Sequence, residues 1–264
     1  MKIGFIGAGN MAKAMMGGII KNNIFSANEI IASDASAMAL EVAKNELEIN
    51  VTSDNKEVVK NSEIVVLSVK PQYYKAVIKE IKELVTDEKI VITIAPGQTL
   101  AYLEELFEKN LKIVRTMPNT PALVGEGMTG VCANDSVTDS ELEYVCSILK
   151  GFGKVQVIGE NLMDVVVAVS GSSPAYVFML IEAMADAAVS DGMPRVAAYE
   201  FAAQAVFGSA KMVLDTKKHP GELKDMVCSP GGTTIEAVRV LEEKGFRSAM
   251  IEAMKACTNK AKGM

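Results

Sequence analysis

Residues 7–12, with the sequence Gly-Ala-Gly-Asn-Met-Ala, form the first pattern in this chain that could bind a phosphate. They follow the apolar run KIGFI and open an amphipathic stretch, which predicts a buried strand, a tight turn and a helix. Gly7 permits the turn, Gly9 lets a phosphate approach the backbone, and Ala12 keeps the helix close to the strand. The helix start adds unpaired N–H groups and the positive end of a dipole. Because the pattern also opens a series of alternating strands and helices, it predicts dinucleotide binding.

The end of the next predicted strand, in IIASDAS, places an acidic residue where a dinucleotide-binding fold contacts ribose. The Asp34 carboxylate can accept hydrogen bonds from a free 2′-hydroxyl and would repel a 2′-phosphate. No basic residue follows until Lys44. This pattern favours NADH over NADPH. In the alternative interpretation, Asp34 merely caps a helix, and Ser33 and Ser36 accommodate the phosphate.

A second anion-binding pattern lies at residues 229–234, Ser-Pro-Gly-Gly-Thr-Thr, in a region otherwise rich in helix formers. If a helix begins after the glycines, Ser229 is a plausible cap and Pro230 costs nothing among donors that lack an intrahelical partner. The two glycines leave the backbone uncovered, and Thr233 and Thr234 add hydroxyl donors. Since the dinucleotide's phosphates are already assigned to residues 7–12, this turn is predicted to bind a substrate carboxylate. The alternative is an ordinary glycine-rich turn before a helix.

The remaining composition excludes several other kinds of chemistry. A net charge of −6 and a pI near 5.1 argue against binding of nucleic acid or anionic lipid. The single histidine, His219, lies in an HPG turn pattern, so we predict neither a His-rich metal site nor a Ser/His/Asp triad, and no metal. The four cysteines form no close pairs, which predicts reduced thiols and a cytoplasmic protein.

The pattern of elements divides the chain into two predicted domains. Up to about residue 158, β-branched runs alternate with helical patterns, which predicts an α/β domain with a mostly parallel sheet over residues 1–159. Residues 160–264 contain no β-rich run and are predicted to form an all-helical domain. We expect no exported or membrane-spanning segment, because the start lacks a long apolar run and Glu182 and Asp186 interrupt the most apolar later stretch.

Two helices of the second domain are predicted to be apolar on nearly all sides. Residues 173–190 carry only a stripe formed by Glu182, Asp186 and Ser190, and the helix opening at Pro194 is almost as apolar. A domain of about a hundred residues can hardly bury both, so we predict an interface with a second copy of the chain. The alternative is a single tight bundle within one chain.

Several blocks of the sequence together resemble the Δ1-pyrroline-5-carboxylate reductase family. The most specific is DMVCSPGGTTIEAV, and the others agree with it in order and spacing: FIGAGNMA, SVKP, RTMPNTP, EGMT, SGSSPAY, DGMPR and HPGELKDMV. The resemblance covers essentially the whole chain. It implies a Rossmann-type dinucleotide-binding domain followed by an all-α dimerisation domain, in a homodimer or larger homo-oligomer whose active site is shared between subunits.

The resemblance also implies a reaction and its residues. Hydride passes from NAD(P)H to C5 of the pyrroline ring, which gives L-proline in the last step of its biosynthesis. The substrate-binding residues are Glu160, Ser229, Thr233 and Thr234, with the Thr234 hydroxyl near the ring nitrogen as the catalytic group. Met226 stands where some relatives have asparagine. The implied cofactor-binding residues are Ile6, Gly7, Ala8, Gly9, Asn10, Met11, Ala12, Ser33, Asp34, Asn55, Val69, Lys70, Pro71, Ala95 and Pro96.

The sequence also contains residues and patterns that could indicate other functions. Lys70 is predicted to shape the cofactor wall rather than act as an acid, Tyr176 to lie in the core, and Cys228 to be a small buried thiol. A β-hydroxyacid type dehydrogenase would need an acid/base lysine on the helical domain, yet no lysine lies between Lys154 and Lys211. The remaining alternatives are another imine reductase and a non-catalytic NAD(H)-binding protein.

Overall fold

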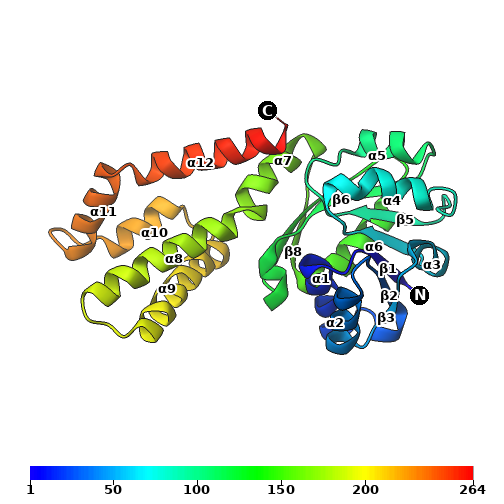
Figure 1. Cartoon of the computed structure of the whole chain (residues 1–264). Helices are drawn as coiled ribbons and strands as arrows, with labels where there is room; N and C mark the ends of the chain where they lie inside the picture. The colour runs from blue at the N-terminus through cyan, green and yellow to red at the C-terminus, as the bar shows by residue number, and fades with distance from the viewer. Residues whose placement is uncertain (264) are drawn as a thin grey trace. The chain divides into compact units, whose positions relative to one another are not determined.

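The chain folds into two compact units in a computed structural model that describes residues 1–263 (Figure 1). The first unit contains Met1–Ser172 together with the chain from Cys257 on, and the second is Ser173–Ala256. The segment from residue 160 to Ser172 therefore folds with the sheet. The domain boundary between residues 159 and 160 stays a prediction about where the dimerisation region begins.

An eight-stranded sheet forms the centre of the first unit. Its strand order is β3-β2-β1-β4-β5-β6-β7-β8, and every neighbouring pair is parallel except β6 and β7. Seven of these strands correspond to apolar or β-branched runs that predict strands, namely KIGFIG, EIIAS, EIVVLSV, KIVITIA, KIVRTM, GVCA and KVQVI. The pattern misses β3, a three-residue edge strand too short to show a periodicity. The bounds are β1 Ile3–Ile6, β2 Ile30–Ser33, β3 Asn50–Thr52, β4 Ile64–Leu67, β5 Ile90–Thr93, β6 Lys112–Met117, β7 Gly127–Ala133 and β8 Gly153–Val157.

Helices cover both faces of this sheet, because consecutive strand residues pack into two different apolar clusters. Val66 joins the cluster that contains side chains of α1, α2 and α6, whereas Val65 and Leu67 join the one that contains α3, α4 and α5. This arrangement confirms the predicted α/β domain with a mostly parallel sheet. The α-helices of the unit are α1 Asn10–Lys21, α2 Ala37–Leu47, α3 Asn55–Asn61, α4 Tyr74–Ile81, α5 Leu100–Phe107, α6 Asp139–Leu149 and α7 Met163–Val166.

Short tight helical turns connect many of these elements. They are 3₁₀ turns except for Val167–Gly171, which is a π-helical turn. One buried tyrosine fixes the carboxyl ends of two central strands, since the Tyr74 hydroxyl lies 2.7 Å from both the Leu67 carbonyl of β4 and Thr93 Oγ1 of β5. Burial raises the pKa of Tyr74 to about 12. The 3₁₀ turns are Ala27–Glu29, Pro71–Tyr73, Thr120–Val124, Lys150–Phe152 and Glu160–Leu162.

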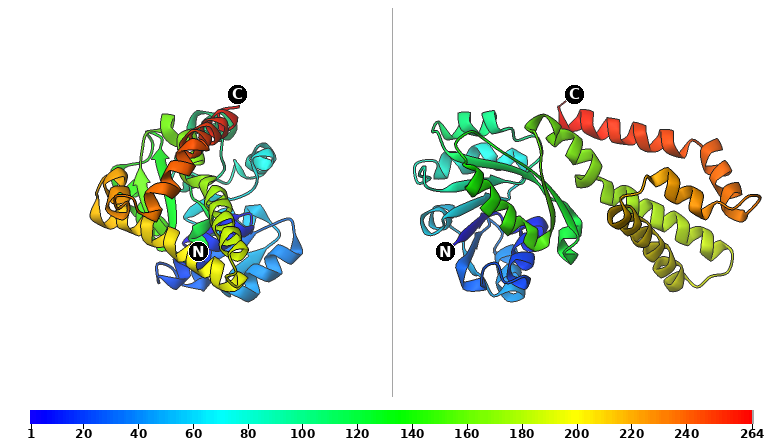
Figure 2. Two further views of the ribbon diagram at one scale, coloured as in Figure 1. Left: turned by 90° about the vertical axis from the view of Figure 1, so that its left-hand side faces the viewer. Right: turned by 180° about the vertical axis from the view of Figure 1, so that it is seen from behind.

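The second unit consists of helices with little buried surface of their own. α8 and α9 lie side by side (Figure 2), and Arg195 Nη1 donates to Asp186 Oδ1 at 2.5 Å between them. Large apolar side chains on both helices are exposed, including Phe178 at 62% and Phe201 at 70%. Exposed apolar surface of this kind supports the prediction that a second copy of the chain covers this face of α8 and α9. The helices are α8 Ser173–Ser190, α9 Arg195–Thr216, α10 Pro220–Val227, α11 Thr233–Glu243 and α12 Phe246–Ala261.

The stretch Glu160–Ser190 is long and apolar enough to cross a membrane by length and composition alone. Its most apolar window has a mean hydropathy of 1.6, and 22% of that window is buried. The backbone across this stretch is not one regular helix, since a 3₁₀ turn, α7 and the π-turn precede α8. A helix that is covered by a second copy of the chain would be as apolar as a membrane-spanning helix.

Candidate functional site

The glycine loop after β1 is tightly packed at Gly7 and exposed at Gly9, where a phosphate would need room. Gly7 has φ +106°, and a Cβ there would lie 2.7 Å from the Ser68 carbonyl oxygen, so only glycine fits. Ser68 Oγ donates to the carbonyls of Ile6 and Gly7 at 3.0 and 2.7 Å and fixes the loop. A Cβ on Gly9 would meet no atom within 4 Å among the described residues.

Gly9 is also the N-cap of α1, and no side chain of the described chain caps this helix. The first N–H groups of α1 therefore point into open space with the positive end of the helix dipole. This loop fits the pyrophosphate of a dinucleotide, because it offers backbone donors and has no side chain in the way.

Beside this loop lies a cleft of about 650 Å³. Asp34 lines it, and both carboxylate oxygens accept backbone N–H groups at 2.8 Å, one from Ala8 and one from Ser36. The acidic residue thus ties the end of β2 to the glycine loop. The cleft is lined by Ile6, Gly7, Gly9, Asp34, Ala35, Ser36, Asn55, Ser68, Val69, Lys70, Tyr73, Ala76 and Val77.

The two serines of the alternative interpretation, Ser33 and Ser36, lie in different surroundings. Ser33 is fully buried, and its hydroxyl donates to Asn55 Oδ1 at 2.7 Å. Ser36 is the residue that caps α2, since its hydroxyl accepts the N–H of Ala39 at 3.2 Å. Asp34 is therefore not the cap of α2, and Ser33 contacts two cleft residues, Asn55 through its hydroxyl and Gly7 through its carbonyl.

A second cavity of about 270 Å³ continues from the first, because Ser68, Val69 and Lys70 line both. It lies at the carboxyl ends of β4, β5 and β6, where α/β sheets bind ligands. The other lining residues are Met11, Pro71, Ile94, Ala95, Pro96, Met117, Pro118, Asn119, Thr120 and Gly171.

Most cofactor residues implied by the sequence line one of these two cavities, and four do not. Ala8 and Ala12 are buried, Ser33 is covered, and Asn10 begins α1 but lines a different hollow on that helix. Sequence reasoning missed the wall formed by residues 117–120 and Gly171 as part of the site. The available signal was the carboxyl end of β6, in the RTMPNTP block.

Glu160 lies in a buried charge cluster of the first unit. Its Oε1 accepts the Leu100 N–H at 2.7 Å and Arg115 Nη1 at 3.0 Å, and Arg115 also donates to Asp164 at 3.2 Å. Arg115 is 3% exposed, whereas the Glu160 side chain is 33% exposed. This arrangement fixes the orientation of Glu160. The role of Arg115 could not be predicted from the sequence, because an isolated arginine in a strand does not indicate which carboxylates it pairs with.

The second anion pattern lies in the helical unit and has the expected open helix start. α11 begins at Thr233 with Gly232 as N-cap, and within residues 1–263 no side chain caps it. The prediction of Ser229 as the cap is wrong, because its carbonyl instead accepts the Gly232 N–H at 3.1 Å and closes a turn before the helix. Gly231 has φ +67° in that turn. Thr233 is exposed and Thr234 is half-buried.

The remaining candidate residues have structural explanations. His219 is the N-cap of α10, and its Nδ1 accepts the Gly221 N–H at 3.0 Å. Tyr176 and Cys228 are half-buried in the single chain, so the core position of Tyr176 and the buried thiol of Cys228 stay predictions. No group of three or more His, Cys, Asp or Glu residues in the described chain could hold a metal ion.

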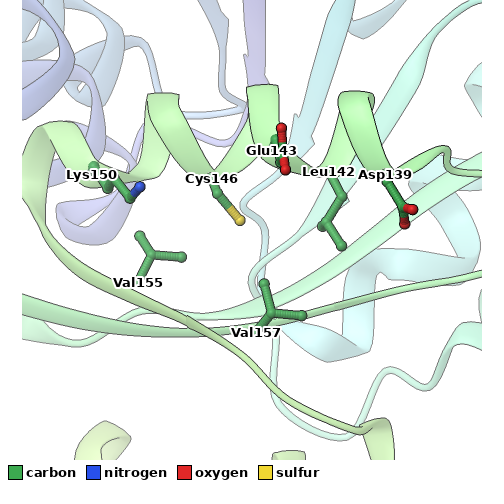
Figure 3. Close-up of a pocket in the computed structure, with 7 residues that line it drawn as sticks. All are labelled: Asp139, Leu142, Glu143, Cys146, Lys150, Val155 and Val157. Atoms are coloured by element: carbon green, nitrogen blue, oxygen red, sulfur yellow. The ribbon is translucent and has the colours of Figure 1, made fainter.

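A separate hollow between α6 and β8 contains none of the predicted residues (Figure 3). Cys146 points into it between Glu143 and Lys150, opposite Val155. Burial raises the pKa of the Cys146 thiol, which keeps it protonated and unreactive at neutral pH. We assign this hollow no part in the candidate site.

Taken together, the open glycine loop, the paired cavities and the sheet topology define a dinucleotide-binding oxidoreductase with a Rossmann-type fold. Residues 160–264 match the family model described as pyrroline-5-carboxylate reductase dimerisation. Residues 2–97 match the model described as NADP oxidoreductase, coenzyme F420-dependent.

Relatives of known identity match over almost the whole chain. It is 52% identical to the pyrroline-5-carboxylate reductase of Escherichia coli (strain K12), covering 98% of this chain and 97% of that protein. The enzyme of Methanosarcina acetivorans is 44% identical, covering 99% and 97%. The crystal structure of Plasmodium falciparum pyrroline carboxylate reductase with NADP bound is 34% identical, has a TM-score of 0.92 and covers 100% and 97%. The chain belongs to the pyrroline-5-carboxylate reductase family, which confirms the resemblance and the fold class.

The open space at Gly9 leads to a first prediction. In Gly9→Ala the added methyl meets no protein atom, so the melting temperature should stay within about 2 °C, the shift expected for under 1 kcal/mol. The methyl would lie where the pyrophosphate approaches, and we expect affinity for NAD(P)H to fall by about tenfold or more, as measured by the fluorescence of the bound dihydronicotinamide.

Gly17→Ala on the same helix is the matched control, since its methyl would make only an ordinary contact with Leu47 at 3.5 Å. That variant should keep both stability and cofactor affinity. Undiminished affinity in Gly9→Ala would show that the loop does not hold the pyrophosphate.

Proposed function

We propose that this protein reduces L-1-pyrroline-5-carboxylate to L-proline, the last step of proline biosynthesis. The observation that carries the proposal is the pairing of an open dinucleotide loop with a second, uncapped helix start elsewhere in a chain that matches the family end to end. NAD(P)H, when bound, supplies the hydride that C5 of the pyrroline ring accepts. The protein's own residues bind and orient the two reactants.

The proposed cofactor is NADH in preference to NADPH. Asp34 lines the cleft with its charge, and a carboxylate at this place disfavours a 2′-phosphate even though both of its oxygens already accept N–H groups. Lys70 is the cationic residue among those that line the cleft. It lies between Val69 and Pro71, which also line the cavities, and this position suits a residue that shapes the wall of the cofactor site. The relative from P. falciparum was solved with NADP, so the residues of this chain have to decide its own preference.

The proposed substrate site combines the turn of residues 229–234 with Glu160. The free N–H groups of Thr233 and Thr234 and the Ser229 hydroxyl suit the substrate carboxylate, which explains why no basic side chain is needed there. A Cβ on Gly232 would lie 2.4 Å from Ser229 Oγ, so glycine leaves that hydroxyl room. The orientation of Glu160 is already fixed by Arg115 and Leu100, and a fixed carboxylate favours a protonated imine.

Thr234 is the proposed catalytic residue at the ring nitrogen. An imine accepts hydride far better when protonated, and a hydroxyl donor there orients the nitrogen and relays a proton. The pKa of a threonine hydroxyl is too high for a strong acid, so the ring can bind already protonated. Met226 is 64% exposed in the single chain and offers no polar contact in the place where some relatives have asparagine.

The site is proposed to be shared between subunits of a homodimer or larger homo-oligomer in the cytoplasm. The cofactor loop belongs to the sheet unit and the carboxylate turn to the helical unit, while the exposed apolar faces of α8 and α9 suit association of the helical units. One chain's cofactor cleft would then meet the partner's carboxylate turn.

The direct test of the function is a spectrophotometric assay with the purified protein. Oxidation of NAD(P)H at 340 nm should depend on added pyrroline-5-carboxylate, and a catalytic efficiency with NADH above that with NADPH would support the Asp34 argument. Binding of cofactor without oxidation would favour the non-catalytic alternative. A strong NADPH preference would remove the NADH proposal but leave the reductase function standing.

Substitution of Thr234 tests the catalytic assignment. Loss of one hydrogen bond costs about 1–3 kcal/mol, so Thr234→Ala should lower kcat by roughly tenfold to a hundredfold without abolishing it. Thr234→Ser keeps the hydroxyl and should stay near wild type. Thr233→Ser is a control on the exposed neighbour. Full activity and normal substrate KM in Thr234→Ala would show that the assignment is wrong.

Co-expression of two inactive variants tests the shared site. Gly9→Glu places a carboxylate in the cofactor loop, and Thr234→Glu places one in the substrate turn, so each alone should be inactive. If the site combines two chains, random pairing leaves one intact site in each mixed dimer and restores roughly a quarter of the wild-type activity. If each site lies within one chain, the mixture stays inactive, as each variant expressed alone does.

A further inference from the structure

A π-helical turn, Val167–Gly171, forms one wall of the smaller cavity. The Ser172 N–H donates to the Val167 carbonyl at 2.7 Å, which is the five-residue spacing of a π-turn. Such turns are rare and frequently occur at functional sites. The Ser170 carbonyl cannot receive the regular helical hydrogen bond, because residue 174 is a proline and has no N–H.

Asn119 supplies the donor that this carbonyl lacks. Its Nδ2 donates to the Ser170 carbonyl at 3.0 Å, and its Oδ1 accepts the Met128 N–H at 2.8 Å. The side chain is 8% exposed. One amide therefore joins the segment after β6, the start of β7 and the π-turn, which are far apart in the sequence.

The position of the π-turn sets the width of the cavity. Gly171 lines the cavity together with Met117 and Asn119. A Cβ on Gly171 would lie 2.7 Å from Met117 Cε, so a side chain there would displace the flexible end of Met117, which also lines the cavity. A shift of the π-turn by less than one ångström would change the space between Gly171 and Met117.

We infer that Asn119 is a positioning residue that holds the π-turn in place and thereby fixes how a flat dihydronicotinamide ring lies in the smaller cavity. The inference rests on the proposed function and places NAD(P)H across both cavities, because the implied cofactor-binding residues line both. The larger cleft, with the glycine loop and Asp34, holds the rest of the cofactor and does not depend on Asn119. Loss of Asn119 should therefore affect orientation for hydride transfer more than affinity for the adenosine half.

The test compares Asn119→Ser with Asn134→Ser. Asn134 is a matched control, since its Nδ2 donates to the Leu111 carbonyl at 2.8 Å and its Oδ1 accepts the Ile113 N–H at 3.1 Å, at the opposite end of β6. Both variants lose an amide that bridges backbone groups, and both should lose similar stability. Only Asn119→Ser should lower kcat, by about tenfold, and reduce the fluorescence of bound NAD(P)H. Affinity for ADP-ribose, which lacks the nicotinamide, should be unchanged in both.

A second variant covers the case in which Asn119→Ser does not fold. Gly171→Ala narrows the same wall without removing a hydrogen bond, and it should lower kcat and the fluorescence of bound NAD(P)H while leaving ADP-ribose affinity intact. The inference is overturned if Asn119→Ser, or Gly171→Ala in its place, keeps the wild-type kcat and NAD(P)H fluorescence. It is also overturned if the affinities for ADP-ribose and NAD(P)H fall together.

The two proposals can fail separately. A wild-type protein that binds NAD(P)H but does not oxidise it with pyrroline-5-carboxylate contradicts the proposed function. The fluorescence and ADP-ribose measurements still decide the role of Asn119 in that case, because they require no turnover.

Discussion

Unpaired backbone N–H groups at two helix starts are the feature on which the candidate site depends. α1 and α11 each begin after a glycine N-cap, and no side chain among the described residues occupies the cap. Other helices of the chain close this position with their own side chains, as Ser36, Thr99 and Thr138 do. A capped helix start has already used its best donor, whereas an open one remains available for an anion. α4, α7 and α9 also lack a side-chain cap, but α1 and α11 combine an open start with a glycine N-cap, and in the proposed function each serves one negatively charged group of the reactants.

The acidic side chains near the site are held by hydrogen bonds within the protein. Both oxygens of Asp34 accept backbone N–H groups, and one oxygen of Glu160 is held by Arg115 and by the start of α5. Carboxylates fixed in this way lose rotational freedom, so they select ligands by repulsion and attraction without having to reorganise. In the proposed function, neutral backbone donors bind the anions, and fixed acidic groups decide which ligands fit beside them. This division explains how an acidic chain with a net charge of −6 can bind two anionic molecules.

The sequence predicted the sheet well because its central strands are buried on both faces and therefore read as continuous β-branched runs. It missed β3, which is short and lies at the edge. It also missed Arg115 and Asn119, since their partners lie 45 and 51 residues away and no local pattern announces such contacts. The error at Ser229 has a local cause: the glycines after Pro230 form a turn of their own, so the helix starts four residues later than the serine. Periodicity therefore predicts the elements, whereas the polar bridges between them need the folded chain.

The apolar surface of the helical unit is better explained by a second protein copy than by a lipid bilayer. α8 carries Glu182 and Asp186 in the middle of its most apolar stretch, and Asp186 pairs with Arg195 of α9. A bilayer would have to remove water from these charges, whereas a protein interface can leave them at its wet rim. The irregular backbone before α8, with its π-turn, would also expose polar groups to lipid if it spanned the membrane. In a protein environment the same irregularity has a use, because Asn119 can reach the carbonyl that Pro174 leaves unpaired. The apolar composition of this region resembles a membrane span, and its π-turn shapes the cavity. Both features are consistent with a helical region that packs against protein.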